Sequence, residues 1–458
     1  MARNRPTHKE KSAPGRPEKP HRKPRVAAKA PGRGQTEAAE AKKKPAPARQ
    51  QPAALSFADA LKPLLAGGAA AGDLEILHSS PLAHLEYDSE LAIKNQGLAL
   101  FWKHHRLAGQ PEKIIPSPRA RGYRTTSKRR GLLHGSTLYL LFGDKAALPK
   151  KGKPFESSPL EPAEHGELFA FLQKKLSEAT YRLVAGHLNY LIIRGSYAER
   201  AVIFNVDMLN GPLVRKLKML GEHLQRLPQP PVAAFVYLDP SKSDYYLESS
   251  RPAETLHFKK LFGPDKLAVT LAGLRYLFHP TSFSQINEAM VEPMLTKARE
   301  LLRPAASEDL LDLYCGYGLF SLFLAPDYRQ VLAVDGEGPS IRAAQENSKI
   351  NRERGGRVKC LARRITASFL DRELPPPSGP EAVILDPPRQ GPLPGVVKEV
   401  AARGPGKVLH IFCGVDQIPK SLRDWQHQGY RPERIVPLDM FPGSANLEIL
   451  ILLARAEG

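Results

Sequence analysis

Cysteine is almost absent from this sequence, with three residues among 458. They are Cys315, Cys360 and Cys413, and no two of them form a CxxC pair. An odd and sparse set argues against a disulfide framework and indicates a reducing compartment, for which we expect the cytoplasm. The neighbours His104 and His105 have no companions at ligand spacing. We therefore expect no zinc, iron–sulfur cluster or other bound metal.

Long apolar runs are also missing. No stretch approaches the roughly 18 apolar residues that span a bilayer. The first residues combine charge with proline and have no apolar segment of the kind found in secretory signals. No internal repeat of fixed period is visible. The composition, 42% hydrophobic and 25% charged, is that of a globular protein with room for two or three domains, so we expect no membrane association.

Acidic residues are scarce relative to basic ones, and the formal net charge is +20. Residues 1–50 contain 15 Lys and Arg against 4 Glu, so this short part holds +11 of that total. Residues 1–54 have almost no aromatic or β-branched side chains, which predicts a disordered basic tail. We favour sequence-independent contact with RNA phosphates over a tail that only aids solubility.

Two patterns divide the rest of the chain. Residues 55–280 mix short apolar or alternating runs with helical stretches, which predicts an α+β domain for RNA recognition. From 281 to 458, strands and helices alternate, which predicts a parallel, doubly wound sheet. In the first domain, the clearest expected strands are 188–196, 201–207 and 232–239. A helix is expected at 211–227, before the last of these strands.

The end of the second domain narrows the fold class. Strands are expected at 434–441 and 447–455, and only residues 442–446 separate them. A linker this short cannot hold a crossover helix, so the two strands are expected to form an antiparallel hairpin. A doubly wound sheet that ends in such a hairpin is typical of the Rossmann-like methyltransferases that use S-adenosylmethionine (SAM).

The expected ligand site lies at the carboxyl ends of the parallel strands, where open α/β sheets bind ligands. Asp312 and the glycine-containing turn 315–318 follow the first strand, and the glycines let the backbone approach a ligand. Asp335 ends the next strand and suits the hydroxyls of a ribose. Ser321 occupies the place of the third glycine in a dinucleotide-binding GxGxxG, so SAM is favoured over a nicotinamide cofactor.

The sequence DPPRQG at 386–391 follows another buried strand. Its two prolines stop the strand and hold Asp386 at the edge of the sheet. Asp386 and Arg389 are suited to grip a planar, hydrogen-bonding base, although a purely structural pair is the alternative. Enzymes that methylate exocyclic amines have an aromatic ring at the position of Arg389, so this motif points away from amino methylation.

Cys413 ends the next strand, on the same edge, and Glu448 begins the last one. A lone cysteine at the end of a buried strand is also compatible with a small core residue. In the catalytic interpretation, the Cys413 thiolate adds to C6 of uracil and turns C5 into a nucleophile for a sulfonium methyl. Glu448 is then the candidate base for the C5 proton, unless it is an ordinary strand residue that faces solvent.

Taken together, these motifs resemble the RNA uracil-5 methyltransferases, which make 5-methyluridine in tRNA or rRNA. The resemblance covers about 85–457 and is strongest from Phe283 onward. The matching stretches include FSQIN, DLYCGYGLFSL, DPPRQG and LDMFPGSANLEILILLAR.

The resemblance implies contacts to SAM from Gln285, Tyr314 and Asp335, with Asp386 lining the site between SAM and the base. It implies that Cys413 is the nucleophile and Glu448 the base.

The sequence departs from the family at several places. Gly414 and Val415 stand where the family has Asn-Pro after the nucleophile. The final motif reads FPGSANLE instead of Phe-Pro-His-Thr-x-His-Val-Glu, so both histidines are missing. Asp335 replaces a glutamate. The family's OB-like N-terminal module and four-cysteine cluster are not expected, because the first 314 residues contain no cysteine.

We therefore expect a monomeric enzyme that methylates C5 of a uridine in structured RNA. Methylation of another RNA base atom and a non-catalytic RNA-binding homologue remain alternatives. A basic, partly aromatic patch is expected at the RNA face, formed by Arg119, Arg121, Tyr123, Arg124, Lys128, Arg129 and Arg130.

Overall fold

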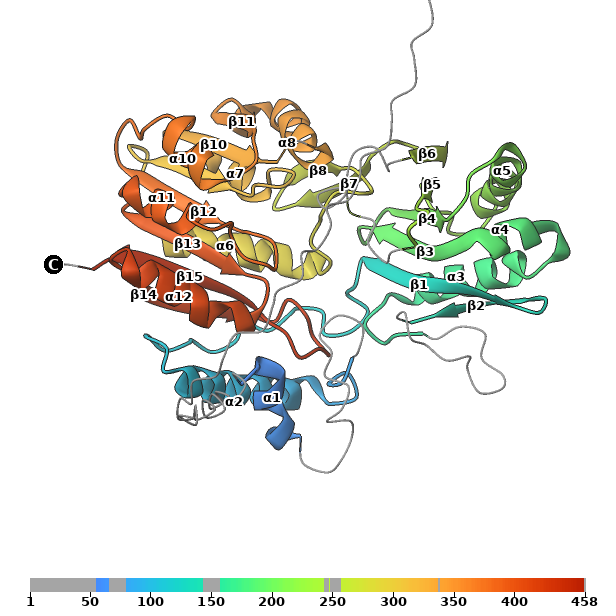
Figure 1. Cartoon of the computed structure of the whole chain (residues 1–458), viewed down its shortest axis with the longest axis horizontal. Coiled ribbons are helices and arrows are strands. Elements are labelled where there is room, and N and C mark those ends of the chain that lie inside the picture. The colour runs from blue at the N-terminus through green and yellow to red at the C-terminus, as the bar shows by residue number, and fades with distance from the viewer. Residues whose placement is uncertain are drawn as a thin grey trace, which may run out of the picture. The chain divides into compact units, whose positions relative to one another are not determined.

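Two large β-sheets organise this protein, one with seven strands and one with six, in a computed structural model (Figure 1). The structure describes residues 55–65, 80–142, 157–242, 247, 257–336 and 338–456. The tail predicted to be disordered, residues 1–54, lies outside the described residues. None of the helices within them combines the length and apolarity needed to cross a bilayer.

The seven-stranded sheet has the order β11-β10-β9-β12-β13-β15-β14. Strands β9 to β13 run parallel, whereas β15 lies antiparallel between β13 and β14. The prediction of a Rossmann-like sheet that ends in an antiparallel hairpin is therefore confirmed. The strands are β9 (Asp309–Leu313), β10 (Gln330–Asp335), β11 (Val358–Ala362), β12 (Glu381–Leu385), β13 (Lys407–Phe412), β14 (Tyr430–Leu438) and β15 (Glu448–Arg455).

Helices cover both faces of this sheet. Every residue of β9 and β12 is buried, as expected for strands between two helical layers. One core cluster joins one set of strand side chains to α6 and α7, and a second joins the alternate set to α10, α11 and α12. These helices are α6 (Val291–Leu302), α7 (Leu319–Leu324), α10 (Ala367–Arg372), α11 (Val396–Ala402) and α12 (Ile418–His427), and α8 (Pro339–Ile350) and α9 (Arg352–Gly355) precede β11.

The N-terminal helices α1 (Phe57–Leu61) and α2 (Tyr87–His105) share the core of α10 to α12. Residues 112–115 then run along β14, with Ile115 N donating to Pro437 O at 2.9 Å and Asp439 N donating to Ile115 O at 2.9 Å. This part of the predicted 55–280 domain therefore packs on the seven-stranded sheet.

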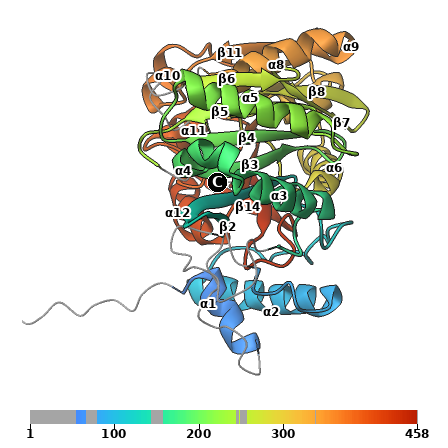
Figure 2. The same cartoon turned by 90° about the vertical axis from the view of Figure 1, so that its right-hand side faces the viewer.

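The six-stranded sheet has the order β2-β1-β3-β4-β5-β6 and contains the strands predicted at 188–196, 201–207 and 232–239. Three helices cover one of its faces (Figure 2). The strands are β1 (Thr126–His134), β2 (Thr137–Leu141), β3 (Leu188–Gly195), β4 (Arg200–Val206), β5 (Ala233–Leu238) and β6 (His257–Phe262). The helices are α3 (Ala163–Leu176), α4 (Arg182–His187) and α5 (Gly211–Gln225).

The predicted helix 211–227 is confirmed as α5, which connects the parallel strands β4 and β5. Asn210 caps it by accepting a hydrogen bond from Leu213 N at 2.9 Å, and Pro212 fits the first turn. The opposite face of the six-stranded sheet joins the core around α6 and the hairpin of β7 (Leu267–Leu271) and β8 (Leu274–Phe278).

Candidate active site

The carboxyl ends of the parallel strands place three predicted site residues side by side. Tyr314 follows β9, and its N–H donates to Val334 O at 2.9 Å, next to Asp335 at the end of β10. On the other side, Asp386 N donates to Leu313 O at 3.3 Å. The sheet therefore brings Tyr314, Asp335 and Asp386 to one edge.

The turn after β9 is shaped to hold the Asp335 carboxylate. Tyr314, Gly316 and Gly318 all have positive φ, at 66°, 57° and 88°. Gly316 N and Gly336 N donate to the two oxygens of Asp335, at 2.7 and 2.6 Å. A non-glycine residue with positive φ costs on the order of 1 kcal/mol, so Tyr314 concentrates strain at this turn.

Asp312 lies beneath this turn and is fully buried. The Ser321 hydroxyl donates to its Oδ2, which explains a serine at the place of a third glycine. Its Oδ1 has no hydrogen-bond partner among the described residues. Burial, together with the charge of Asp335, raises the pKa of Asp312 to about 7.

Cys413 and Glu448 meet across two neighbouring strands. The last paired residues of β13 and β15 are Phe412 and Ile449, so the next step of this antiparallel register sets Cys413 opposite Glu448. Glu448 is 2% exposed, which removes the alternative of a strand residue facing solvent. The Gln417 amide lies 3.9 Å from the Cys413 sulfur, and Asn446 Nδ2 donates to Cys413 O at 3.1 Å.

We use the name carboxylate rim for four acids at this edge: Asp312, Asp335, Asp386 and Glu448. All four resist ionisation. Burial raises the pKa of Asp386 to about 8, and the neighbouring Asp312 and Asp335 add to the rise. Burial and then Asp386 raise the pKa of Glu448 well above its ordinary value. Among the described residues these acids form no group with metal-ligand geometry. An organic cation at this edge would favour the ionised forms of these acids.

The charge of Arg389 acts on the Cys413 thiol. Burial raises the pKa of Cys413 to about 12, and Glu448 and Asp386 contribute to the rise. Arg389 opposes it and lowers the pKa of both Cys413 and Glu448. Positive charge near this edge therefore favours the thiolate.

Gln285 lies in a segment held by the six-stranded sheet. Thr125 N donates to Ile286 O at 2.9 Å, and the buried Arg194 donates to Ser284 Oγ at 2.9 Å. Gln285 and Tyr317 line one narrow cavity, which places Gln285 beside the turn after β9.

The predicted basic patch is wrong for Tyr123 and Arg129, because both side chains are 1% exposed. Arg129 forms an ion pair with Glu161 and lies 3.6 Å from the ring centre of Phe142. Arg121 donates to Glu90, at 2.9 Å. These side chains hold the protein together and cannot all face RNA.

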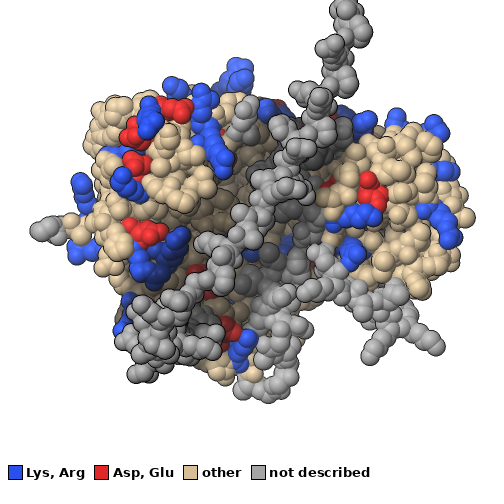
Figure 3. All heavy atoms as spheres, viewed as in Figure 1, with Lys and Arg blue, Asp and Glu red and all other residues tan. Residues whose placement is uncertain are grey.

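On one face of the molecule, basic side chains are instead spread over the surface. On the face shown in Figure 3, Lys and Arg outside the grey segments lie over both halves, with Asp and Glu among them. Within the predicted patch, Arg119 is exposed, whereas Arg124, Lys128 and Arg130 are half-buried.

Replacing Asp312 with asparagine should stabilise the protein at pH 8 in the absence of ligand, by about 2–4 kcal/mol. Because its pKa is raised, folded Asp312 keeps a proton that the unfolded chain loses above about pH 4, so wild-type stability falls as pH rises toward about 7. Urea unfolding at pH 4 and pH 8 measures this gain, which should be smallest at pH 4.

Asp309 lies on the same strand as Asp312 and provides a control, because its replacement should change the free energy of unfolding in the opposite direction. Hydrogen bonds from Arg329 lower its pKa, so Asp309→Asn should destabilise the protein at pH 8. Equal effects of the two substitutions would show that the raised pKa of Asp312 is not the cause.

Comparison with known proteins supports the resemblance seen in the motifs. A family model described as tRNA (Uracil-5-)-methyltransferase matches residues 249–367. The tRNA (uracil(54)-C(5))-methyltransferase of Pyrococcus horikoshii is 26% identical over 81% of this chain and 82% of its own length. The 23S rRNA (uracil(1939)-C(5))-methyltransferase RlmD of Vibrio vulnificus is 25% identical over 82% of this chain and 79% of its own. Over about four fifths of its length, the chain is thus similar to RNA uracil-5 methyltransferases.

A solved structure agrees with the fold of this family. The crystal structure of a Pyrococcus abyssi tRNA (uracil-54, C5)-methyltransferase, in complex with S-adenosyl-L-homocysteine, aligns with a TM-score of 0.60 and 22% identity. The alignment covers 82% of this chain and 85% of that one. The resemblance inferred from the motifs is therefore confirmed at the level of the RNA uracil-5 methyltransferase family.

Proposed function

We propose that this protein transfers the methyl group of SAM to C5 of a uridine in tRNA or rRNA, through a covalent bond from Cys413. Similarity to the RNA uracil-5 methyltransferases supports the reaction class. The observation that carries the mechanism is the placement of Cys413 opposite the buried Glu448 and in the electrostatic neighbourhood of Asp386.

The residues at this edge fit SAM. Asp335, with its carboxylate fixed by two backbone N–H groups, would accept hydrogen bonds from the ribose hydroxyls. Tyr314 and Gln285 would complete the contacts, and Asp386 would line the boundary between SAM and the base. The cationic ammonium and sulfonium of SAM would complement the carboxylate rim, where burial and neighbouring acids raise the pKa values. When bound, SAM supplies an electrophilic methyl group.

Cys413 begins the reaction at C6 of the uracil. Its thiol proton passes to the ionised form of Asp386, a carboxylate that the raised pKa makes a good acceptor, and the thiolate then forms a bond to C6. The C5–C6 double-bond electrons move onto C5 and O4, so that C5 becomes nucleophilic and accepts the methyl group. Arg389 stabilises the negative charge as the thiolate forms.

Glu448 completes the reaction. After methyl transfer, C5 still holds its hydrogen, and the ionised Glu448 carboxylate removes it as a proton. The C–H electrons rebuild the C5–C6 double bond and the C6–S bond breaks, which releases the Cys413 thiolate. One proton is released to water in each turnover.

The six-stranded sheet and its helices, within the predicted 55–280 domain, would select the RNA. A stacked base hides the faces of both C5 and C6, so the target uridine must lie in a loop or be flipped out of a helix. We expect the enzyme to act as a monomer.

Deletion of the gene tests the proposal. We expect 5-methyluridine to disappear from one position when total RNA is mapped with and without the gene. Wild-type protein should restore it, and Cys413→Ala should not. Loss of a different modification would favour methylation of another base atom. Loss of no modification, with RNA and SAM binding intact, would favour a non-catalytic homologue.

A further inference from the structure

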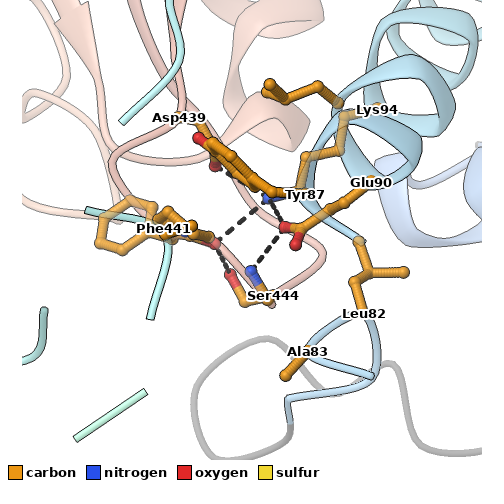
Figure 4. A network of polar contacts seen from close by, with 12 residues as sticks. Leu82, Ala83, Tyr87, Glu90, Lys94, Asp439, Phe441 and Ser444 are labelled. Carbon is orange, nitrogen blue, oxygen red and sulfur yellow. Dashed lines mark hydrogen bonds and ion pairs between the residues drawn. The ribbon is translucent and has the colours of Figure 1, made fainter. Parts of the chain in front are cut away.

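Three charged side chains are fully buried beside the loop that leads to Glu448. Glu90 and Lys94 project from α2, and Asp439 begins the 439–447 loop between β14 and β15 (Figure 4). All three are 0% exposed. Burying such a cluster costs free energy unless its charged atoms have well-placed ion-pair and hydrogen-bond partners.

Lys94 is fully satisfied. Its ammonium group contacts Glu90 Oε1 at 2.7 Å, Asp439 Oδ1 at 2.8 Å and Phe441 O at 3.2 Å. An ammonium has three N–H donors, so every one has an acceptor. Two of these acceptors belong to the loop, which ties its first residues to one position on α2.

A second layer fixes the two carboxylates. Glu90 accepts hydrogen bonds from Gly443 N and from Arg121. Tyr87 donates from its hydroxyl to Asp439 Oδ2 at 3.0 Å and accepts from Ser117 N at 2.7 Å. The network thus joins α2, the segment that leads to β1, and the loop.

The middle and end of the loop are held as well. Tyr123 donates to Pro442 O at 3.0 Å, and Leu82 N donates to Gly443 O at 3.0 Å. Gly443 has a φ of 79°, and a Cβ there would lie 2.6 Å from Leu160 Cδ2, so this position admits no larger residue without rearrangement. The loop runs from there through Asn446, which bonds to Cys413 O, into Glu448.

We propose that Glu90, Lys94 and Asp439 are positioning residues that direct Glu448 toward the uracil bound at Cys413. This inference rests on the proposed function. Buried ion networks often add little net stability compared with apolar side chains, and their best-attested use is to specify one arrangement. Here the specified arrangement is that of a nine-residue loop, 439–447, between the strand β14 and the proposed base.

Asp439→Asn tests the inference, because it keeps the size of the side chain and removes its charge. With SAM labelled in its methyl group, and total tRNA and rRNA from cells that lack the gene, kcat should fall about 10–100-fold. The KM values for RNA and SAM should stay within about twofold. Because proton removal from C5 is the affected step, a covalent protein–RNA complex that survives denaturation should accumulate on natural uridine.

Glu381→Gln is the matched control. It breaks the Arg403–Glu381 ion pair, in which both side chains are at least nine-tenths buried, at the start of β12 and thus at the opposite edge of the sheet. We expect reduced thermal stability with no accumulated covalent complex and an unchanged kcat.

Two results would overturn the inference: an unchanged kcat in Asp439→Asn, or a lower kcat without accumulation of the covalent complex. If wild-type protein itself forms neither 5-methyluridine nor a complex, the proposed function fails, and not the network alone. If Asp439→Asn does not fold, Tyr87→Phe, which removes one hydrogen bond to Asp439, should show the same pattern at about three- to tenfold.

Discussion

Replacing Cys413 with alanine should lower methyl transfer to RNA by on the order of 10⁴-fold or more, while SAM and RNA binding persist. Without a group that adds to C6, C5 of uracil is too weak a nucleophile to take the methyl. The side chain is half-buried at the end of β13, so removal of its sulfur costs little packing. Incorporation of labelled methyl into RNA measures the loss of transfer. Equilibrium binding measurements test whether SAM and RNA still bind.

Cys360→Ala is the control for this substitution. Cys360 is another half-buried cysteine, on the edge strand β11, and burial likewise raises its pKa. Methylation should continue in this variant. If Cys413→Ala also continued to methylate RNA, the covalent mechanism would be wrong, and a base nitrogen would become the better target, because a nitrogen needs no addition step.

Replacing Glu448 with glutamine should separate the two halves of the reaction. The amide keeps the shape of the side chain but cannot remove the C5 proton, so turnover should fall about 10²–10⁴-fold. Addition should not be slowed, because Glu448 raises the pKa of Cys413 and its neutralisation favours the thiolate. Methylated RNA should therefore remain attached to the protein.

The measurement for Glu448→Gln is the amount of labelled methyl that stays with protein after denaturation. We expect close to one methyl per protein, against a trace for wild type. Glu381→Gln, far from Cys413 on the sheet, should behave as wild type. Normal turnover of Glu448→Gln would show that another group, such as Asp386, is the base.

The catalytic half of the fold was predictable because its signals are local. Each buried parallel strand is a short apolar run, and its carboxyl end is marked by chemistry at Asp335, Asp386 or Cys413. The short linker expected at 442–446 was enough to predict the antiparallel hairpin, although β14 ends at Leu438 and the loop spans 439–447. The placement of Cys413 opposite Glu448 follows from that hairpin, once β15 inserts next to β13.

The network below the loop could not be predicted, because its partners are distant in sequence. Glu90 and Lys94 are four residues apart on a helix, a spacing typical of a solvated ion pair. Their burial depends on Asp439, which lies 345 residues after Lys94. The predicted basic patch was wrong for a similar reason, because Arg129 forms an ion pair with Glu161 and packs against two aromatic rings.

The structure shows what surrounds the positions at which this chain departs from the family motif. The first missing histidine corresponds to Gly443, where Leu160 and Ala83 occupy the space that a side chain would need. The second corresponds to Asn446, which bonds to the backbone of Cys413. Gln417 provides a polar contact to the sulfur in a chain that lacks Asn-Pro after the nucleophile.

The most direct test of covalent catalysis uses RNA that contains 5-fluorouridine, because fluorine at C5 cannot leave as a proton does. Wild-type protein, SAM and this RNA should yield a stable complex, and mass spectrometry of its peptides should find a methylated 5-fluorouridine bonded to Cys413. Methyl transfer to natural RNA with no such adduct, or with an adduct on another residue, would contradict the mechanism.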